Sequence, residues 1–273
     1  MTPRYSAPRD LAGVTAALAD GDGVVVGGGT MVVPDMTHGR TSAAVVVDLS
    51  RAGLAGVTAG EDGAVVGAMT TYTDLITSDV PLLSTVASGI TGGPQIRNRG
   101  TAGGSACYAN PASDVPACLV ALGARMRLAS AGGAREVPAA EFFLGGFRTA
   151  RRPDEVLEAF VVPPLGGAAL GYLKFKLAEG SWPIVTAATF APTGGPLRIV
   201  VGGAAATPVA VDVDRPSVGS DDPAWREHVR EAVHTALDAA EPWTDVLAPA
   251  AYRRRIAPVI AARSAGRALE EDR

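Results

Sequence analysis

The sequence is long enough for several packed units and too apolar to be disordered: of its 273 residues, 47% are hydrophobic and 19% charged. A formal net charge of −4 excludes the electrostatic footprint of a nucleic-acid-binding protein and of a polybasic membrane surface. No apolar run approaches the roughly 20 residues that span a bilayer, and the first residues lack a signal-peptide core, so we expect a cytoplasmic protein.

Cysteine and histidine are too sparse for a metal centre within this chain. Cys107 and Cys118 are the only cysteines, which is too few for the four thiolates of an iron–sulfur cluster or for a structural zinc site. The three histidines are scattered, and His228 and His234 do not share a helix face, so solvated or capping roles are expected. Any metal centre is therefore expected in another chain.

The first fifty residues predict a small α/β unit. Apolar residues at helical spacing indicate a helix over 10–20, and the β-branched run 24–26 indicates a buried strand that three glycines terminate. A short helix over 31–36 and a second strand over 43–49 are expected to follow.

Two further units are predicted, because the kind and spacing of the predicted elements change along the chain. Short strands, such as those expected over 64–67 and 125–129, are separated by glycine-rich or proline-bearing loops and by two or three helices, which indicates an α+β unit. The last unit is predicted to be an antiparallel meander closed by two helices, with strands over 170–177, 184–190, 197–201 and 207–213. The predicted divisions are 1–56, 57–165 and 166–273.

The final predicted helix, over 249–270, carries an apolar stripe and several arginines. The arginines mostly occupy other faces than the stripe, so they are interpreted as a solvated basic face rather than a binding patch. They are Arg253, Arg254, Arg263 and Arg267.

A glycine-rich turn after the first predicted strand is a candidate anion site. The run from Gly27 to Thr30 lacks Cβ atoms at three positions, so amide N–H groups can converge on a pyrophosphate. An ordinary tight turn explains the same residues. The dinucleotide pattern G-x-G-x-x-G fails, because Val32 stands where its third glycine belongs and little room is left for a crossover helix.

A second segment, from Gly92 to Pro116, crowds glycines together with threonine, serine and aspartate. This composition is typical of a loop that offers N–H donors and hydroxyls to a phosphate-bearing ligand. A serine-hydrolase motif is absent, because Cys107 stands where a glycine should follow Ser105. A Cys107 nucleophile is disfavoured, because the sequence identifies no base beside it.

Together these segments resemble the FAD-binding, or medium, subunit of the molybdenum hydroxylases, the family of xanthine dehydrogenase and aerobic carbon monoxide dehydrogenase. The family pattern A-G-G-T-x-L-x-P-x-M is similar to residues 27–36. The pattern Q-I-R-N-x-G-T-x-G-G-N, followed by P-x-x-D, is similar to residues 95–105 and 111–114. The resemblance extends to nearly the whole chain, because further similarity is found in residues 154–157, 172–175 and 252–255.

The resemblance implies a fold and a cofactor. The fold is α+β, with two FAD-binding subdomains of the p-cresol methylhydroxylase and vanillyl-alcohol oxidase type. A C-terminal sheet-and-helix domain of the carbon monoxide dehydrogenase flavoprotein type follows them. The cofactor is non-covalent FAD bound between the two subdomains, whereas iron–sulfur and molybdopterin centres belong to partner chains.

The resemblance also implies site residues. Those expected to hold the FAD pyrophosphate are Gly27, Gly28, Gly29, Thr30, Met31, Thr101, Gly103, Gly104 and Ser105. Asp114 would hydrogen-bond a cofactor hydroxyl, while Leu157, Tyr172 and Lys174 would lie near the isoalloxazine ring or its adjoining groups. A valine at either Gly28 or Gly104 is expected to fill the space of the phosphate. No catalytic residue is assigned.

The implied function is electron transfer in a hydroxylase complex with iron–sulfur and molybdopterin subunits, from which FAD passes electrons to NAD, a quinone or oxygen. Serine at 105 in place of the family's asparagine, and threonine at 37 in place of lysine, are mild departures. Ala178 and Ser181 stand where the family often has arginine and aspartate. A freestanding FAD-dependent oxidoreductase that acts on a small molecule therefore stays open, as does a scaffold that has lost the flavin.

Overall fold

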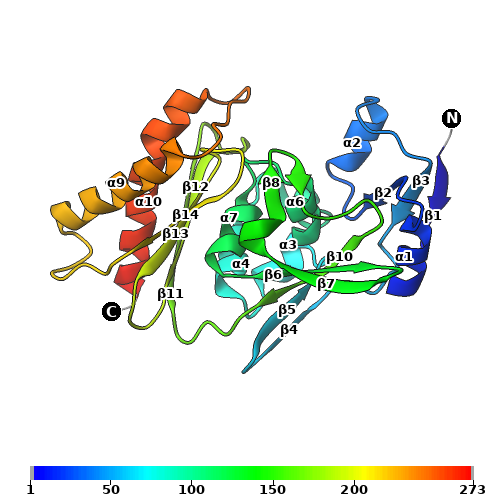
Figure 1. Cartoon of the computed structure of the whole chain (residues 1–273), viewed down its shortest axis with the longest axis horizontal. Helices are drawn as coiled ribbons and strands as arrows, with labels where there is room; N and C mark the ends of the chain where they lie inside the picture. The colour runs from blue at the N-terminus through cyan, green and yellow to red at the C-terminus, as the bar shows by residue number, and fades with distance from the viewer. Residues whose placement is uncertain (1–2, 272–273) are drawn as a thin grey trace.

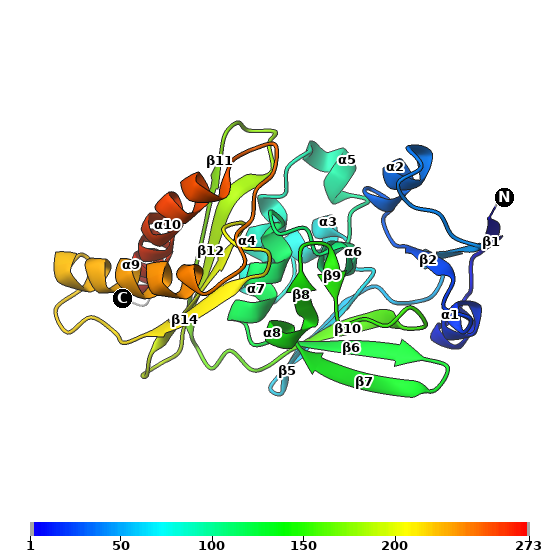
Figure 2. The same ribbon diagram turned by 45° about the horizontal axis from the view of Figure 1, so that its top comes forward.

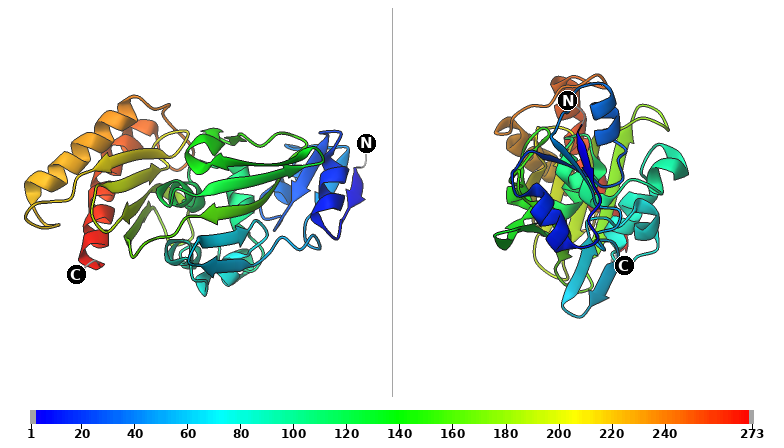
Figure 3. Two further views of the ribbon diagram at one scale, coloured as in Figure 1. Left: turned by 60° about the horizontal axis from the view of Figure 1, so that its bottom comes forward. Right: turned by 90° about the vertical axis from the view of Figure 1, so that its right-hand side faces the viewer.

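Three sheet-based units follow one another along the molecule (Figures 1 and 3). The computed structural model describes residues 3–271. We refer to residues 4–48 as the N-terminal unit, to 57–162 as the middle unit and to 169–271 as the C-terminal unit. The fold is mixed α+β, as expected.

The N-terminal unit is a small parallel sheet packed against the next unit. Its strands, in spatial order, are β1 (Arg4–Ser6), β3 (Val45–Asp48) and β2 (Gly23–Val26). Helix α1 (Leu11–Leu18) buries Val14 and Leu18 against this sheet and against Ala129 and Val156 of the middle unit. Helix α2 (Val32–Thr37) begins directly after the glycine-rich turn and has no buried residue.

The middle unit is an antiparallel five-stranded sheet with helices on it. The strand order is β4 (Val57–Gly60), β5 (Gly63–Gly67), β10 (Val156–Val162), β6 (Arg125–Ser130) and β7 (Gly133–Pro138). A two-stranded ribbon, β8 (Phe143–Gly145) and β9 (Arg148–Thr149), lies beside it.

The expectation of two or three helices in this unit is wrong, because its described residues contain six. They are α3 (Tyr72–Ile76), α4 (Pro81–Ser88), α5 (Gly93–Arg97), α6 (Ala102–Tyr108), α7 (Asp114–Ala121) and α8 (Ala139–Phe142). Each has at most eight residues, so apolar periodicity barely develops, and glycine or proline in the first turn of four of them is typical of a loop. The segment expected to be a loop, 92–116, holds α5, α6 and the start of α7.

The C-terminal unit confirms the predicted antiparallel meander and its two closing helices. Its elements are β11 (Ala169–Lys176), β12 (Pro183–Ala191), β13 (Leu197–Gly202), β14 (Val209–Val213), α9 (Pro223–Asp238) and α10 (Ala250–Glu271). Figure 2 shows α9 and α10 on one face of this sheet and α7 on the other. Alternate residues therefore enter different cores: Ala187 and Val201 pack with the two long helices, whereas Ala188 and Val200 pack with the middle unit.

The interpretation of the α10 arginines as one solvated face is wrong for Arg253, which is fully buried. Its guanidinium donates to the carbonyl oxygens of Ala248 at 3.1 Å and Gly203 at 2.9 Å, and it pairs with Asp245. A buried guanidinium is tolerated when each N–H finds such an acceptor. The other three lie at least partly on the surface, and all three histidines are exposed.

The division of the chain at 56 and 165 stays a prediction, although both positions fall in connections between sheets. Both cysteines are free. Within residues 3–271, no helix has the length and apolar character needed to cross a bilayer.

Candidate functional site

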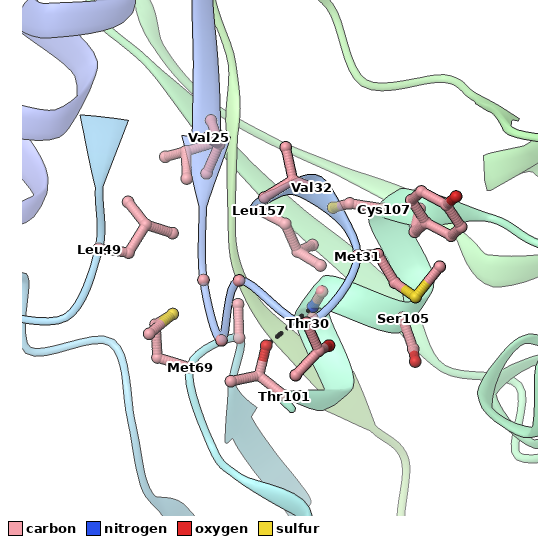
Figure 4. Close-up of a pocket in the computed structure, with 18 of the residues that line it drawn as sticks. Val25, Thr30, Met31, Val32, Leu49, Met69, Thr101, Ser105, Cys107 and Leu157 are labelled. Atoms are coloured by element: carbon pink, nitrogen blue, oxygen red, sulfur yellow. Dashed lines mark hydrogen bonds between the residues drawn. The ribbon is translucent and has the colours of Figure 1, made fainter. Parts of the chain in front are cut away.

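A cavity of about 250 Å³ lies where the N-terminal unit meets the middle unit (Figure 4). Its walls come from β2 and the turn after it, from α6, from the start of β10 and from Trp182 in the β11–β12 turn. Ten of the residues expected to bind a cofactor line it: Gly27, Gly28, Gly29, Thr30, Met31, Thr101, Gly103, Gly104, Ser105 and Leu157. The fold thus brings together two segments about seventy positions apart.

The turn after β2 offers a cluster of free donors. Among the described residues, the backbone N–H groups from Gly28 to Met31 have no hydrogen-bond acceptor, and all four residues line the cavity. Gly29 adopts a left-handed conformation, with a φ of 74°, which glycine reaches without strain. Because unpaired N–H groups seek acceptors, this turn is suited to an anion.

The facing segment offers hydroxyl groups instead. From Ala102 to Ser105 every backbone N–H already donates within the protein. Thr101 is the N-cap of α6, and its Oγ1 accepts from the Gly104 N–H at 3.0 Å, the dashed line in Figure 4. The expectation that both glycine-rich segments present free N–H groups is therefore wrong for the second, because a threonine-capped helical turn uses them.

The glycines of the two segments have different uses. A Cβ at Gly28 would lie 1.8 Å from the carbonyl oxygen of Arg99, so this glycine allows the two segments to touch at their backbones. A Cβ at Gly103 would lie 2.4 Å from the Ala68 carbonyl oxygen. At Gly104 the only atom within 4 Å would be Thr101 Oγ1, at 2.9 Å. The expected filling of ligand space thus applies to Gly104 and not to Gly28.

One side of the cavity is apolar and the other carries hydroxyl groups. Figure 4 shows Val25, Leu49 and Met69 on one side of the turn and Ser105 on the other. The Ser105 hydroxyl hydrogen-bonds to the phenol of Tyr72, whose pKa burial raises. A ligand with flat apolar rings and a polar linker would match both walls.

Among the residues that the structure describes, Arg151 is the only charged one that lines this cavity. Its Nη1 donates to the carbonyl oxygens of Arg152 at 2.9 Å and Glu155 at 2.7 Å. Sequence reasoning missed Arg151, and it missed Trp182 as well. Neither stands in a glycine-rich segment, and no spacing rule connects them to one.

The other three expected cofactor contacts lie outside the cavity lining and bond to one another. Asp114 Oδ1 accepts from Lys174 Nζ at 3.1 Å and from the Tyr172 hydroxyl, while Lys174 also donates to the Gly89 carbonyl. Burial raises the pKa of Asp114, against the lowering effect of Lys174. These side chains join α7 to β11 next to Ser113, which does line the cavity. Their contact with a cofactor stays a prediction.

Cys107 lines the cavity, but its environment does not suit a nucleophile. Burial raises the pKa of its thiol to about 11, with Arg151 acting in the opposite direction, so the thiol stays protonated near neutral pH. Across residues 3–271, no group of three or more histidine, cysteine or acidic side chains is placed to hold a metal ion.

Comparison with known proteins adds four findings. Residues 1–165 match the family described as the FAD binding domain in molybdopterin dehydrogenase. The chain is 32% identical to the carbon monoxide dehydrogenase medium chain of Hydrogenophaga pseudoflava over 270 residues, 93% of this chain and 92% of that one. It is 34% identical to the xanthine dehydrogenase FAD-binding subunit of Escherichia coli O157:H7 over 182 residues, 64% and 62% of the respective chains. A chain of a Cu,Mo-CO dehydrogenase crystal structure superposes with a TM-score of 0.88 at 30% identity, covering 99% of both chains.

Proposed function

This chain belongs to the FAD-binding medium subunits of the molybdenum hydroxylases, and we propose that it holds FAD non-covalently in the cavity between β2 and α6. It acts as the electron-transfer subunit of an oxidoreductase complex, between an iron–sulfur partner and an acceptor that is NAD, a quinone or oxygen. A molybdopterin subunit carries out the hydroxylation. The two cysteines of this chain are too few for a cluster of its own.

The observation that carries the proposal is the row of four unpaired N–H groups from Gly28 to Met31. A diphosphate is rich in acceptor oxygens, and consecutive N–H groups without neighbouring side chains can converge on one. The hydroxyls of Thr101 and Ser105 stand on the facing wall and supply further donors. No carboxylate of the described residues lines the cavity to repel an anion.

The remaining contacts of the cofactor follow from the two walls. Leu157 and the apolar side of the cavity exclude water from a ring system. Asp114 would use Oδ2 for a cofactor hydroxyl, because its Oδ1 already accepts from Tyr172 and Lys174. FAD, when bound, supplies reversible one- and two-electron redox chemistry.

Purification of the intact chain tests the cofactor assignment. We expect a yellow protein that releases its flavin on acid or heat denaturation, because no covalent link is proposed. Flavin that stays attached to the denatured chain would contradict non-covalent binding. A colourless protein that takes up no added FAD would favour the scaffold alternative.

Co-expression tests the subunit assignment. Alone, the chain is expected to turn over no hydroxylase substrate. Together with iron–sulfur and molybdopterin subunits of its own complex, it should form a stable assembly in which substrate bleaches the flavin absorbance. If the isolated chain reduces its own FAD with a specific small molecule at a catalytically useful rate, the freestanding oxidoreductase replaces the subunit.

A further inference from the structure

Arg151 carries a positive charge that no carboxylate of residues 3–271 neutralises. The guanidinium forms hydrogen bonds to two carbonyl oxygens and no ion pair. The neighbouring carboxylate of Glu155 pairs instead with Arg135 and Arg152, with N–O distances of 2.6 and 3.3 Å. The charge of Arg151 is therefore available to an anion from outside the chain.

A network of hydrogen bonds around the buried carboxylate of Glu155 holds this guanidinium in place. Arg135 binds the Glu155 carboxylate with two hydrogen bonds, of 2.6 and 2.9 Å, and the side chain of Glu155 is only 3% exposed. The Arg152 N–H donates to the same carboxylate at 2.7 Å, which closes the turn whose carbonyl oxygens accept from Arg151 Nη1. Because one end of the guanidinium is fixed, its Nε and Nη2 donors lose little rotational freedom when they bind an anion.

Arg151 lines the same cavity as the four residues with free N–H groups. Cys107 also lines this cavity, and the charge of Arg151 lowers the pKa of its thiol against the larger effect of burial. Figure 4 shows Cys107, Met31 and Val32 among the side chains that line this cavity. The guanidinium and the free N–H groups are therefore donors to one and the same cavity.

We propose that Arg151 is the cationic residue that binds the diphosphate of FAD and gives this chain its preference for FAD over an uncharged flavin. The assignment rests on the proposed function. The diphosphate supplies the two negative charges of FAD, and riboflavin has neither. An arginine held in a largely uncharged cavity therefore discriminates between the two flavins by charge.

Binding measurements on the flavin-free full-length chain test this assignment, with FAD, ADP and riboflavin as ligands. Arg151→Gln removes the charge and keeps most of the bulk, whereas Arg151→Lys keeps the charge. Arg148→Gln is the matched control, because Arg148 is exposed, lies three positions away and does not line the cavity. Affinity is read from quenching of flavin fluorescence and from calorimetry for ADP.

Arg151→Gln is expected to bind FAD and ADP roughly ten- to a hundredfold more weakly than the wild type, with riboflavin binding unchanged. The deficit should shrink as salt is added, because salt screens the lost interaction. Arg151→Lys should recover most of the loss, and Arg148→Gln should match the wild type.

Two results would overturn the assignment while leaving the proposed function in place. One is wild-type affinity of Arg151→Gln for FAD and ADP at low salt. The other is an equal loss for FAD and riboflavin, which would mean that the variant alters the shape of the cavity. A wild-type chain that binds neither FAD nor ADP would overturn the proposed function and this assignment together.

Discussion

Gly28→Ala is expected to destabilise the flavin-free protein, because the added methyl group meets main-chain atoms. A Cβ at this position would lie 1.8 Å from the Arg99 carbonyl oxygen and 2.6 Å from its carbon. Ordinary contacts begin at 3.4 Å, so the two segments must move apart by about 1.6 Å, and overpacking of this kind costs about 3 kcal/mol. At about 2–4 °C per kcal/mol for a chain of this size, Tm should fall by about 6–12 °C.

Gly104→Ala is the matched control for that change. Its methyl group would lie 2.9 Å from the Thr101 hydroxyl, a side-chain atom that must shift and so weakens its cap on α6, while alanine within a helix is favoured over glycine by about 0.5–1 kcal/mol. Because these two effects oppose each other, the flavin-free Tm of Gly104→Ala should stay much nearer to that of the wild type than the Tm of Gly28→Ala, while FAD affinity falls because the methyl group occupies the cavity. Circular dichroism melting and FAD titration measure the two quantities. A wild-type Tm for Gly28→Ala would refute the packing argument.

Three further predictions concern other parts of the site. Asp114→Ala leaves Tyr172 and Lys174 without their buried acceptor and should lower the free energy of unfolding in urea by about 3–5 kcal/mol; Asp114→Asn should lose less, and equal losses would contradict the pairing. Burial raises the pKa of Glu155, but its hydrogen bonds from Arg135 and Arg152 outweigh burial and lower it. The stabilisation by Glu155 is therefore present above the unfolded-state pKa, near 4.3, and is lost as pH falls through the lower folded-state pKa. Glu155→Gln should thus be less stable at neutral pH and lose less stability on acidification, in urea titrations at several pH values; parallel pH profiles would argue against this. Because the pKa of Cys107 is raised to about 11, iodoacetamide should modify it about a hundredfold more slowly than an ordinary thiol near pH 8; mass spectrometry follows the reaction, and rapid labelling of the folded chain would count against the burial effect.

Local signals in the sequence were sufficient for much of the fold. The strands of the C-terminal unit are nearly continuous apolar runs, and their ends were predicted to within about two residues because polar or glycine-rich turns bound them. The turn at Gly27 to Thr30 was recognised because three glycines after a β-branched run are unusual in any other context.

Tertiary packing decided what local signals could not. The segment from Thr101 to Ser105 has the composition of a loop, yet a threonine cap and close backbone contact at Gly103 make it the first turn of α6. Arg253 has the composition of a surface residue, but carbonyl oxygens from distant strands surround it. Arg151 and Trp182 reach the cavity only through the arrangement of whole units, which no sequence period encodes.

Because Trp182 lines the cavity, the cavity is completed late in the synthesis and folding of the chain. The residues that line the cavity run from Gly23 to Trp182. Both glycine-rich segments must therefore be synthesised, and the C-terminal sheet must pack on α7, before the cavity is complete. A ligand that binds only the finished cavity adds about 2.7 kcal/mol of stability when its concentration is a hundred times Kd. Cofactor supply would then govern how many chains survive proteolysis, and flavin-starved cells should hold less of this protein at an unchanged rate of synthesis.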